Sequence, residues 1–170
     1  MAEQERESVI RQAADAYGGA FHADLLEQYK LYVQSAENVS ARRVISNRYL
    51  LTLNAALVAL YGLQSATFGQ GYWTLLIPVI GIAVSLLWYL IIRSHADLNR
   101  IKFDVIHEFE QHLPAAMYEY EWKLAKRGRG KTYRTVTTIE GWIPVLFAVL
   151  HVVLAVMIIL SIAGVVDWTR

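Results

Sequence analysis

The chain has 170 residues, of which 55% are hydrophobic, and a formal net charge of +1. This length corresponds to a single domain, whereas the hydrophobic content lies above that of a typical soluble domain. The absence of cysteine excludes disulfides, thiolate metal sites and cysteine nucleophiles. The net charge by itself is uninformative, because the distribution of the charges along the chain carries the information. We expect no nucleic-acid partner.

Residues 1–48 are expected to form a cytoplasmic N-terminal amphipathic helix. No proline or glycine occurs at 21–61, so this helix is expected to continue unbroken into the segment that follows. Its apolar residues recur at spacings of four and three, which places them in one stripe along a helix: Leu25, Tyr29, Tyr32, Ala36 and Val39.

The next stretch, 49–92, contains no Asp, Glu, Lys or Arg. A helix needs about 20 apolar residues to cross a hydrocarbon core of roughly 30 Å, so this stretch fits two crossings. We predict transmembrane helices at 49–66 and 73–92, joined by a periplasmic turn at 67–72 that contains two glycines.

Residues 93–141 are again polar and charged and are expected to form a cytoplasmic helical loop. Because an amphipathic helix cannot satisfy its apolar face alone, this region should pack on the N-terminal helix or on neighbouring subunits. The sequence leaves both alternatives open. A second apolar stripe, ended by Pro114, marks the helix of this loop: Leu98, Ile101, Val105, Ile106, Phe109 and Leu113.

Two motifs in this loop resemble ligand sites. The run AKRGRGKT at 125–132 matches a relaxed P-loop, but no apolar strand precedes it and a membrane span follows it closely. His107 and His112 resemble a zinc-binding pair, but a spacing of five places them about 140° apart around a helix. We therefore expect no nucleotide, no metal and no other cofactor.

A second uncharged stretch, 141–166, predicts the third transmembrane helix at 142–165 and a periplasmic tail at 166–170. All lysines and arginines except Arg170 lie before the first span or between the second and third spans. The positive-inside rule then places the N-terminus in the cytoplasm and the C-terminus in the periplasm. The expected fold class is all-α: an integral membrane protein with three transmembrane helices and a cytoplasmic helical region.

Basic residues gather directly before the third span. At this position they set the topology, and we expect them to contact anionic lipid headgroups. The patch comprises Lys123, Lys126, Arg127, Arg129, Lys131 and Arg134.

Four polar residues fall inside the predicted spans, namely Thr52, Asn54, Ser85 and His151. Each needs a hydrogen-bond partner away from lipid. We expect Thr52 and Ser85 to bond to their own helix backbone, and Asn54 and His151 to bond between helices. A polar path through the membrane is the alternative. Gly81 and Ser85 form one of several pairs of small residues that allow helices to approach closely.

Two blocks of the chain resemble the RipA family of bacterial inner-membrane proteins. The first, EQYKLYVQSAENVSARRVISNRYLLTLNAALVALYG at 27–62, is similar to the opening of that family, and the second, at 97–123, is similar to its loop between spans two and three. The resemblance covers about 25–165 and implies a homo-octameric ring of three-span subunits in the inner membrane, with no known reaction. The family-like positions of the loop are Asn99, Lys102, Glu110, Leu113, Pro114, Glu121 and Trp122.

Opposite charges on the two cytoplasmic segments predict ion pairs, within a subunit or between subunits, that fix the geometry of the oligomer. Anchoring of the arginines at the membrane surface by snorkelling is the alternative. The candidate residues are Arg42, Arg43, Asn47 and Arg48 before the first span, and Glu108, Glu110 and Glu121 in the loop.

Three functions remain open at this point. Symmetric closure and the polar span residues favour a channel-like assembly that conducts ions, solutes or lipid. The absence of charge within the spans favours a non-conducting scaffold that organises partner proteins or lipids. A membrane-disrupting effector in bacterial defence is suggested by analogy alone. We expect no enzyme, because no polar catalytic groups converge on a pocket.

Overall fold

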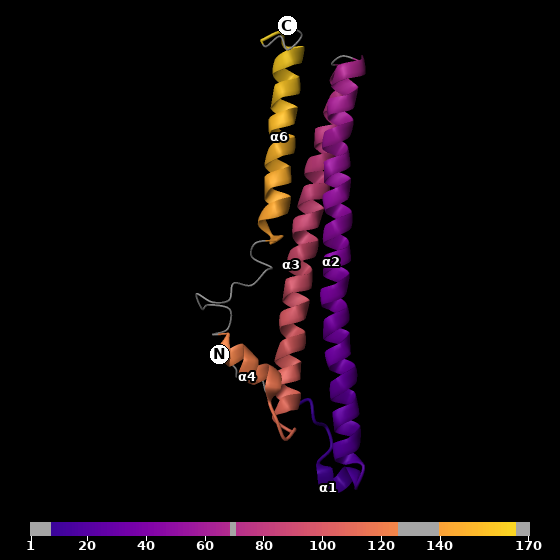
Figure 1. Ribbon diagram of the computed structural model, residues 1–170, viewed down its shortest axis with the longest axis vertical. Coiled ribbons are helices and arrows are strands. Elements are labelled where there is room, and N and C mark those ends of the chain that lie inside the picture. Colours follow the sequence, from indigo (N-terminus) through magenta and orange to yellow (C-terminus); the bar gives the residue numbers. More distant parts are fainter. Residues whose placement is uncertain (1–7, 69–70, 126–139, 166–170) are drawn as a thin grey trace. The chain divides into compact units, whose positions relative to one another are not determined.

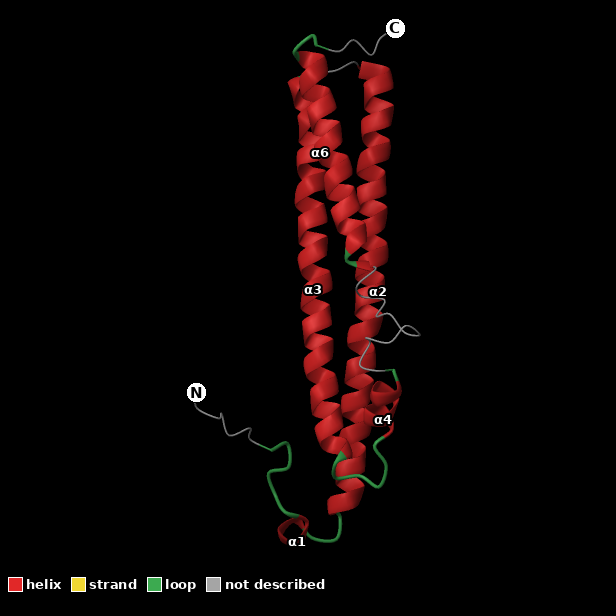
Figure 2. Cartoon of the chain, turned by 90° about the vertical axis from the view of Figure 1, so that its left-hand side faces the viewer, coloured by secondary structure: helices red, strands yellow, loops and turns green. Residues whose placement is uncertain are grey.

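The computed structural model describes residues 8–68, 71–125 and 140–165, and within them it is built of helices with no strand (Figures 1 and 2). This confirms the all-α fold class. The elements in chain order are α1 (Ala14–Tyr17), α2 (Phe21–Phe68), the 3-10 helix η1 (Tyr72–Leu75), α3 (Leu76–Glu110), α4 (Met117–Leu124) and α6 (Trp142–Ile162).

Helix α2 runs without a break through the N-terminal stripe and the first predicted span, as the lack of proline and glycine up to residue 61 predicts. Helix α3 is longer than expected, because it continues past residue 92 and includes the apolar stripe of the loop. The charged residues that begin at Arg93 end the apolar run, but they do not interrupt the helical hydrogen bonding. Pro78 and Pro144 lie in the first turns of α3 and α6, where no backbone donor is required.

Three helical segments are long and apolar enough to cross a membrane within the described residues. They are Phe21–Gln64, Tyr72–Glu110 and Trp142–Ile162. The second contains the whole span predicted at 73–92, and the first and third cover most of the spans predicted at 49–66 and 142–165. Three transmembrane helices are therefore assigned to the chain.

The chain divides into two compact units. Unit 1 comprises Met1–Ala41 and Asp97–Arg134, and unit 2 comprises Arg42–Ala96 and Thr135–Arg170. All three predicted spans lie in unit 2, whereas both predicted amphipathic stripes lie in unit 1.

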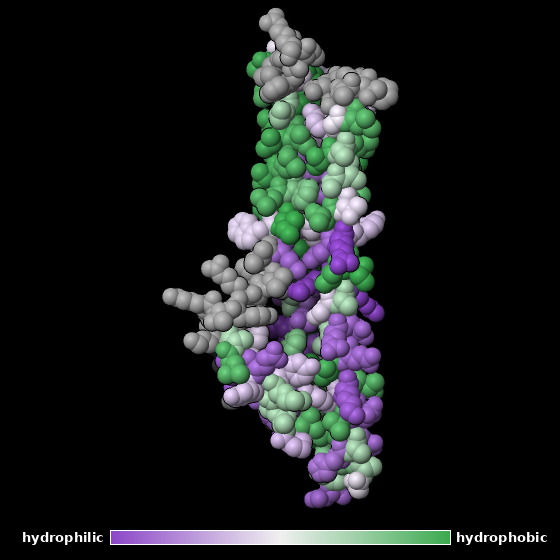
Figure 3. All heavy atoms as spheres, viewed as in Figure 1, coloured by the Kyte–Doolittle hydropathy of each residue, from purple (hydrophilic) through white to green (hydrophobic). Residues whose placement is uncertain are grey.

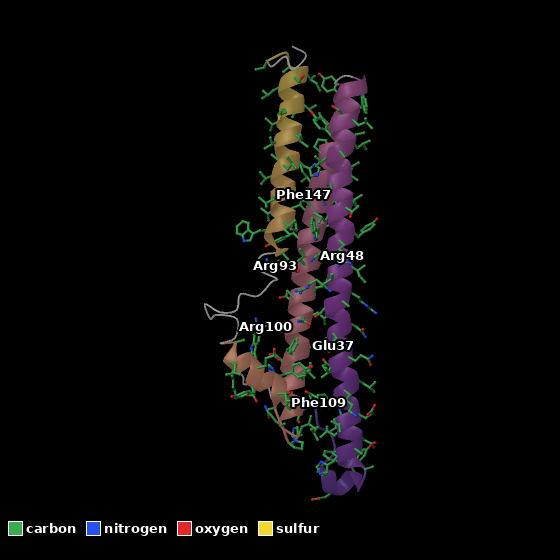
Figure 4. All side chains as sticks on the ribbon, viewed as in Figure 1. Glu37, Arg48, Arg93, Arg100, Phe109 and Phe147 are labelled. Carbon is green, nitrogen blue, oxygen red and sulfur yellow. The ribbon has the colours of Figure 1, made fainter. Side chains whose placement is uncertain are left out.

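The core of unit 1 forms where the two stripes meet. Leu25, Tyr29 and Ala36 of α2 pack against Ile106 and Phe109 of α3, and the partly buried side chains around them include Phe103 and Tyr118 (Figure 4 labels Phe109). The stripes thus pack on each other within one chain, which was one of the two alternatives. Leu98 and Ile101, at the start of the second stripe, are exposed.

The core of unit 2 is small and centres on Leu50, Trp88 and Ile92, with Phe147 of α6 packed against it. The outward faces of its helices are apolar, and in Figure 3 hydrophobic side chains cover α6 and the apolar parts of α2 and α3. Apolar exposure of this kind suits lipid or another membrane helix as the surroundings.

Candidate functional site

A buried hydrogen bond joins α2 and α3 in the middle of their apolar segments. Ser85 Oγ donates to Asn54 Oδ1 at 2.9 Å, and Asn54 Nδ2 donates to the carbonyl oxygen of Leu50 at 2.9 Å. Asn54 and Ser85 are 0% and 1% exposed. The interhelical bond predicted for Asn54 is present, but the backbone bond predicted for Ser85 is wrong, because Ser85 donates to the Asn54 side chain instead.

Helix α6 contributes a third polar residue at this level of unit 2. His151 packs directly against Gly81, one turn before Ser85 on α3, and a Cβ at Gly81 would collide with Cε1, Nε2 and Nδ1 of the imidazole. His151 is 0% exposed, and neither ring nitrogen has a hydrogen-bond partner among the described residues. The interhelical hydrogen bond predicted for His151 is therefore not found there. We call Asn54, Gly81, Ser85 and His151 the polar layer.

A second polar contact between α2 and α3 involves a buried tryptophan. Trp88 Nε1 donates to Asn47 Oδ1 at 2.9 Å, and the Trp88 ring lies 6.1 Å from that of Phe147 on α6. Asn47 was a candidate for contacts between subunits, but here its side chain oxygen is used within unit 2. The sequence gives no sign of this pair, because the two residues lie far apart along the chain.

Arg43 has a partner that the sequence did not single out. Its Nε lies 3.6 Å from Oε2 of Glu140, and both side chains are largely buried. The predicted partners were Glu108, Glu110 and Glu121. The pair lies within one chain and joins the residues that precede the first and third predicted spans.

The other residues expected near the first span have exposed side chains. Arg42 and Arg48 are exposed, as is Thr52, whose hydroxyl donates to the carbonyl oxygen of Arg48 at 2.9 Å. This is the backbone bond that the sequence predicted for Thr52. Arg42 and Arg48 remain candidates for contacts with neighbouring subunits or headgroups.

Glu110 in unit 1 accepts hydrogen bonds from three donors and caps α4. It is 1% exposed, and its carboxylate accepts hydrogen bonds from the Tyr29 hydroxyl (3.1 Å) and from the backbone N–H groups of Tyr118 (2.8 Å) and Glu119 (2.9 Å). Tyr118 and Glu119 lie in the first turn of α4, where free N–H groups and the helix dipole favour a negative charge. The contact predicted between Glu110 and an arginine is thus replaced by bonds within unit 1.

The environment of Glu110 also affects the tyrosine that donates to it. Burial, and then the hydrogen bond to Glu110, raise the pKa of Tyr29 far above its ordinary value of 10.0. The neighbouring Glu108 accepts the backbone N–H of Val9 at 2.7 Å. Glu110 therefore connects α3 with α2 and α4, and Glu108 connects α3 with the segment that precedes α1.

The remaining candidates of the loop lie at its surface or outside the described residues. Glu121 is exposed, and Lys123 Nζ lies 2.6 Å from Oε1 of Glu119. No cluster of three or more metal-ligating side chains is found in the described part of the chain. The rest of the basic patch and most of the P-loop-like run, Lys126, Arg127, Arg129, Lys131 and Arg134, lie outside the described residues.

Comparison with known proteins identifies the family. A family model described as "Octameric membrane protein family (8xMP)" matches residues 26–160. No curated protein and no solved structure matches the chain. The match covers most of the chain and agrees with the resemblance to an octameric membrane family that its sequence blocks carry. The chain therefore belongs to the octameric membrane protein family.

Proposed function

We propose that eight copies of this chain form a non-conducting membrane ring that organises lipids and partner membrane proteins. The observation that carries the proposal is the burial of the polar layer, since Asn54, Ser85 and His151 are almost completely shielded within one subunit. Pathways for ions are lined by carbonyl groups, charged rings or polar side chains that face the conducted species. In this chain Ser85 instead bonds to Asn54, and His151 packs against Gly81.

The outward surface of unit 2 supports the same conclusion. The faces that would meet lipid, neighbours or the ring axis carry large apolar side chains, among them Leu86, Leu87, Val149, Val152 and Val153. A groove of about 360 Å³ between α3 and α6 is lined by Ser85, Leu86, Tyr89, Pro144 and Val149, among others. A groove with such walls suits a lipid acyl chain, whose surface is entirely apolar.

We further propose the inner membrane of a bacterium as the location, with the N-terminus in the cytoplasm and the C-terminus in the periplasm. The support is the concentration of lysine and arginine before the first span and between the second and third. In this orientation the basic patch from Lys123 to Arg134 would meet the anionic headgroups of the cytoplasmic leaflet.

Flux through reconstituted vesicles tests the proposal. The purified octamer is incorporated into liposomes loaded with a small fluorescent dye and potassium ions, with empty liposomes and a pore-forming peptide as the two controls. We expect the octamer to retain dye and ions as empty liposomes do, and native mass spectrometry to find bound phospholipid. Leakage near that of the peptide would contradict the proposal.

A conducting ring is the second candidate, and the exposed side chain of Thr52 favours it. Eight Thr52 hydroxyl groups facing the axis would form a narrow polar constriction of the kind that channels use. Flux that is lost in Thr52→Val and kept in Ser85→Ala would support this candidate. Growth arrest on expression, together with leakage from vesicles, would instead support a membrane-disrupting effector.

A further inference from the structure

Besides Tyr17, Leu26 and Trp122, two groups of large apolar side chains are exposed on unit 1. The first, which we call the hairpin flank, consists of Leu31 on α2 with Leu98 and Ile101 on α3. The second, which we call the α4 stripe, consists of Met117, Tyr120 and Leu124. Ile101 is 58% exposed and Tyr120 is 65% exposed. Unit 1 contains none of the charge-free spans, so lipid does not explain these side chains, and exposed apolar patches outside a membrane mark protein contacts.

The two groups lie on opposite sides of α3. Phe103 of α3 packs against Tyr118 of α4 with ring centroids 6.0 Å apart, so this side of α3 faces α4. Figure 4 shows Arg100, one turn before Phe103, on the side where α4 lies. Ile101 stands two residues before Phe103 and therefore about 200° away around the helix. Leu98 lies one turn before Ile101 and shares its side.

Leu31 extends the hairpin flank from α3 onto α2. Lys102, next to Ile101, donates from Nζ to Ser35 Oγ at 2.8 Å and lies 4.7 Å from the centre of the Tyr32 ring. These contacts show which side of α2 borders this side of α3. Leu31 lies one turn before Ser35 on the same face of α2. The flank is therefore one surface that spans both helices.

An octamer in a membrane requires two such surfaces on each subunit. All copies insert in the same orientation, so their symmetry is cyclic, and a closed ring is made by heterologous contacts between two different surfaces. We propose that the α4 stripe of one subunit packs against the hairpin flank of the next subunit in the octamer. This inference rests on the octameric assembly, and it is independent of whether the ring conducts.

The shape of the α4 surface fits an apolar knob from the neighbour. A hollow of about 420 Å³ is lined by Ala115, Ala116, Met117 and Tyr120, together with the charged residues Glu119 and Lys123. A leucine or isoleucine of the hairpin flank is of a size to enter it.

Disulfide trapping tests the inference directly, because the chain has no cysteine of its own. Ile101→Cys and Tyr120→Cys are combined in one full-length chain and oxidised in membranes with copper phenanthroline. We expect a ladder of covalent oligomers up to the octamer on a non-reducing gel. Each single variant should stay monomeric on that gel, since a heterologous contact does not bring identical residues together.

A matched control places both thiols on the same side of unit 1. Glu37 is exposed and lies two residues after Ser35, hence about 200° around α2 from it. Glu37→Cys combined with Tyr120→Cys should therefore give no ladder. Since Ile101, Tyr120 and Glu37 are all exposed, these substitutions spare the core, and native mass spectrometry of the reduced variants should show the octamer.

Three results would overturn the inference. The first is an octamer that gives no ladder from the Ile101 and Tyr120 pair, and the second is strong dimer formation by either single variant. The third is quenching of a fluorophore on Tyr120→Cys by brominated lipid, which would place the α4 stripe on the bilayer. A wild-type protein that is not an octamer would instead contradict the assembly itself, and vesicle leakage would contradict only the proposed function.

Discussion

The hydroxyl of Ser85 on α3 donates a 2.9 Å hydrogen bond to the side chain oxygen of Asn54 on α2, and both residues are shielded from the surroundings of the subunit. One turn away on α3, Gly81 packs against the ring of His151 from α6. The three transmembrane helices therefore meet around one polar layer, and polar side chains that would attract water in a pore are used for packing within the subunit.

A double-mutant cycle measures the bond between Asn54 and Ser85. Ser85→Ala and Asn54→Leu should show a coupling energy of about 0.6 to 2 kcal/mol, because hydrogen bonds between membrane helices fall in this range. Reversible unfolding in mixed micelles, followed by circular dichroism, provides the free energies. Thr52→Val is the matched control and should change stability by less than about 0.5 kcal/mol, since Thr52 bonds to its own helix. Strictly additive effects of the two substitutions would show that the bond contributes nothing.

The contact of Gly81 with His151 predicts a steric penalty. Gly81→Ala should lower the free energy of unfolding by about 1 to 3 kcal/mol, the usual cost of overpacking, because the added methyl group collides with the imidazole. Gly62→Ala is the control, since a Cβ there meets nothing within 4 Å. Thermal unfolding of the two variants gives the comparison. His151→Ala should relieve the defect of Gly81→Ala, and a Gly81→Ala protein as stable as the wild type would refute the close packing.

Removal of Glu110 should loosen α4. Glu110→Ala leaves the Tyr29 hydroxyl and two backbone N–H groups without their acceptor, which should cost about 2 to 3 kcal/mol. Hydrogen exchange measured by mass spectrometry should show faster exchange in the peptide that contains residues 117–124. Glu121→Ala, at an exposed position of the same helix, should leave exchange unchanged. Equal exchange in the two variants would mean that Glu110 does not cap α4.

The pKa of Tyr29 predicts a loss of stability in alkaline solution. Burial and the bond to Glu110 raise this pKa in the folded state above its ordinary value of 10.0. A raised pKa means that the folded state favours the protonated hydroxyl of Tyr29. The stabilisation from the contact of Tyr29 with Glu110 is therefore complete below pH 10, and it is lost as the pH rises from 10 through the pKa of Tyr29 in the folded state. Ultraviolet titration should find one late-ionising tyrosine fewer in Tyr29→Phe, and stability above pH 10 should fall less steeply in this variant. A Tyr29 that ionises with the exposed tyrosines would contradict the buried contact.

Much of the fold follows from local patterns in the sequence. The uncharged run at 141–166 predicts α6 within a few residues, and the lack of helix breakers predicts the continuity of α2. Gly81 and Ser85 were recognisable as a pair of small residues, and close helix contact does occur there. These features depend on composition and on spacing within one helix, so they can be predicted from the sequence.

The partners of individual side chains could not be predicted in the same way. Glu140 beside Arg43, and Asn47 beside Trp88, join residues that are far apart along the chain and carry no shared motif. Glu110 caps α4 from the end of the preceding helix, whereas the familiar capping pattern places the acidic residue inside the capped helix itself. These contacts arise from packing in three dimensions and leave no local pattern in the sequence.

Access of water to the polar layer and to Thr52 decides between a non-conducting and a conducting ring. Asn54→Cys, Thr52→Cys and Ser85→Cys are prepared one at a time in the full-length octamer, and each is exposed in membranes to a membrane-impermeant cationic thiol reagent from either side. Glu37→Cys, outside the spans, is the positive control. We expect rapid labelling of the control and no labelling of the three span positions. Labelling of Asn54→Cys, Thr52→Cys or Ser85→Cys at the rate of the control would reveal an aqueous path through the ring and contradict a non-conducting assembly.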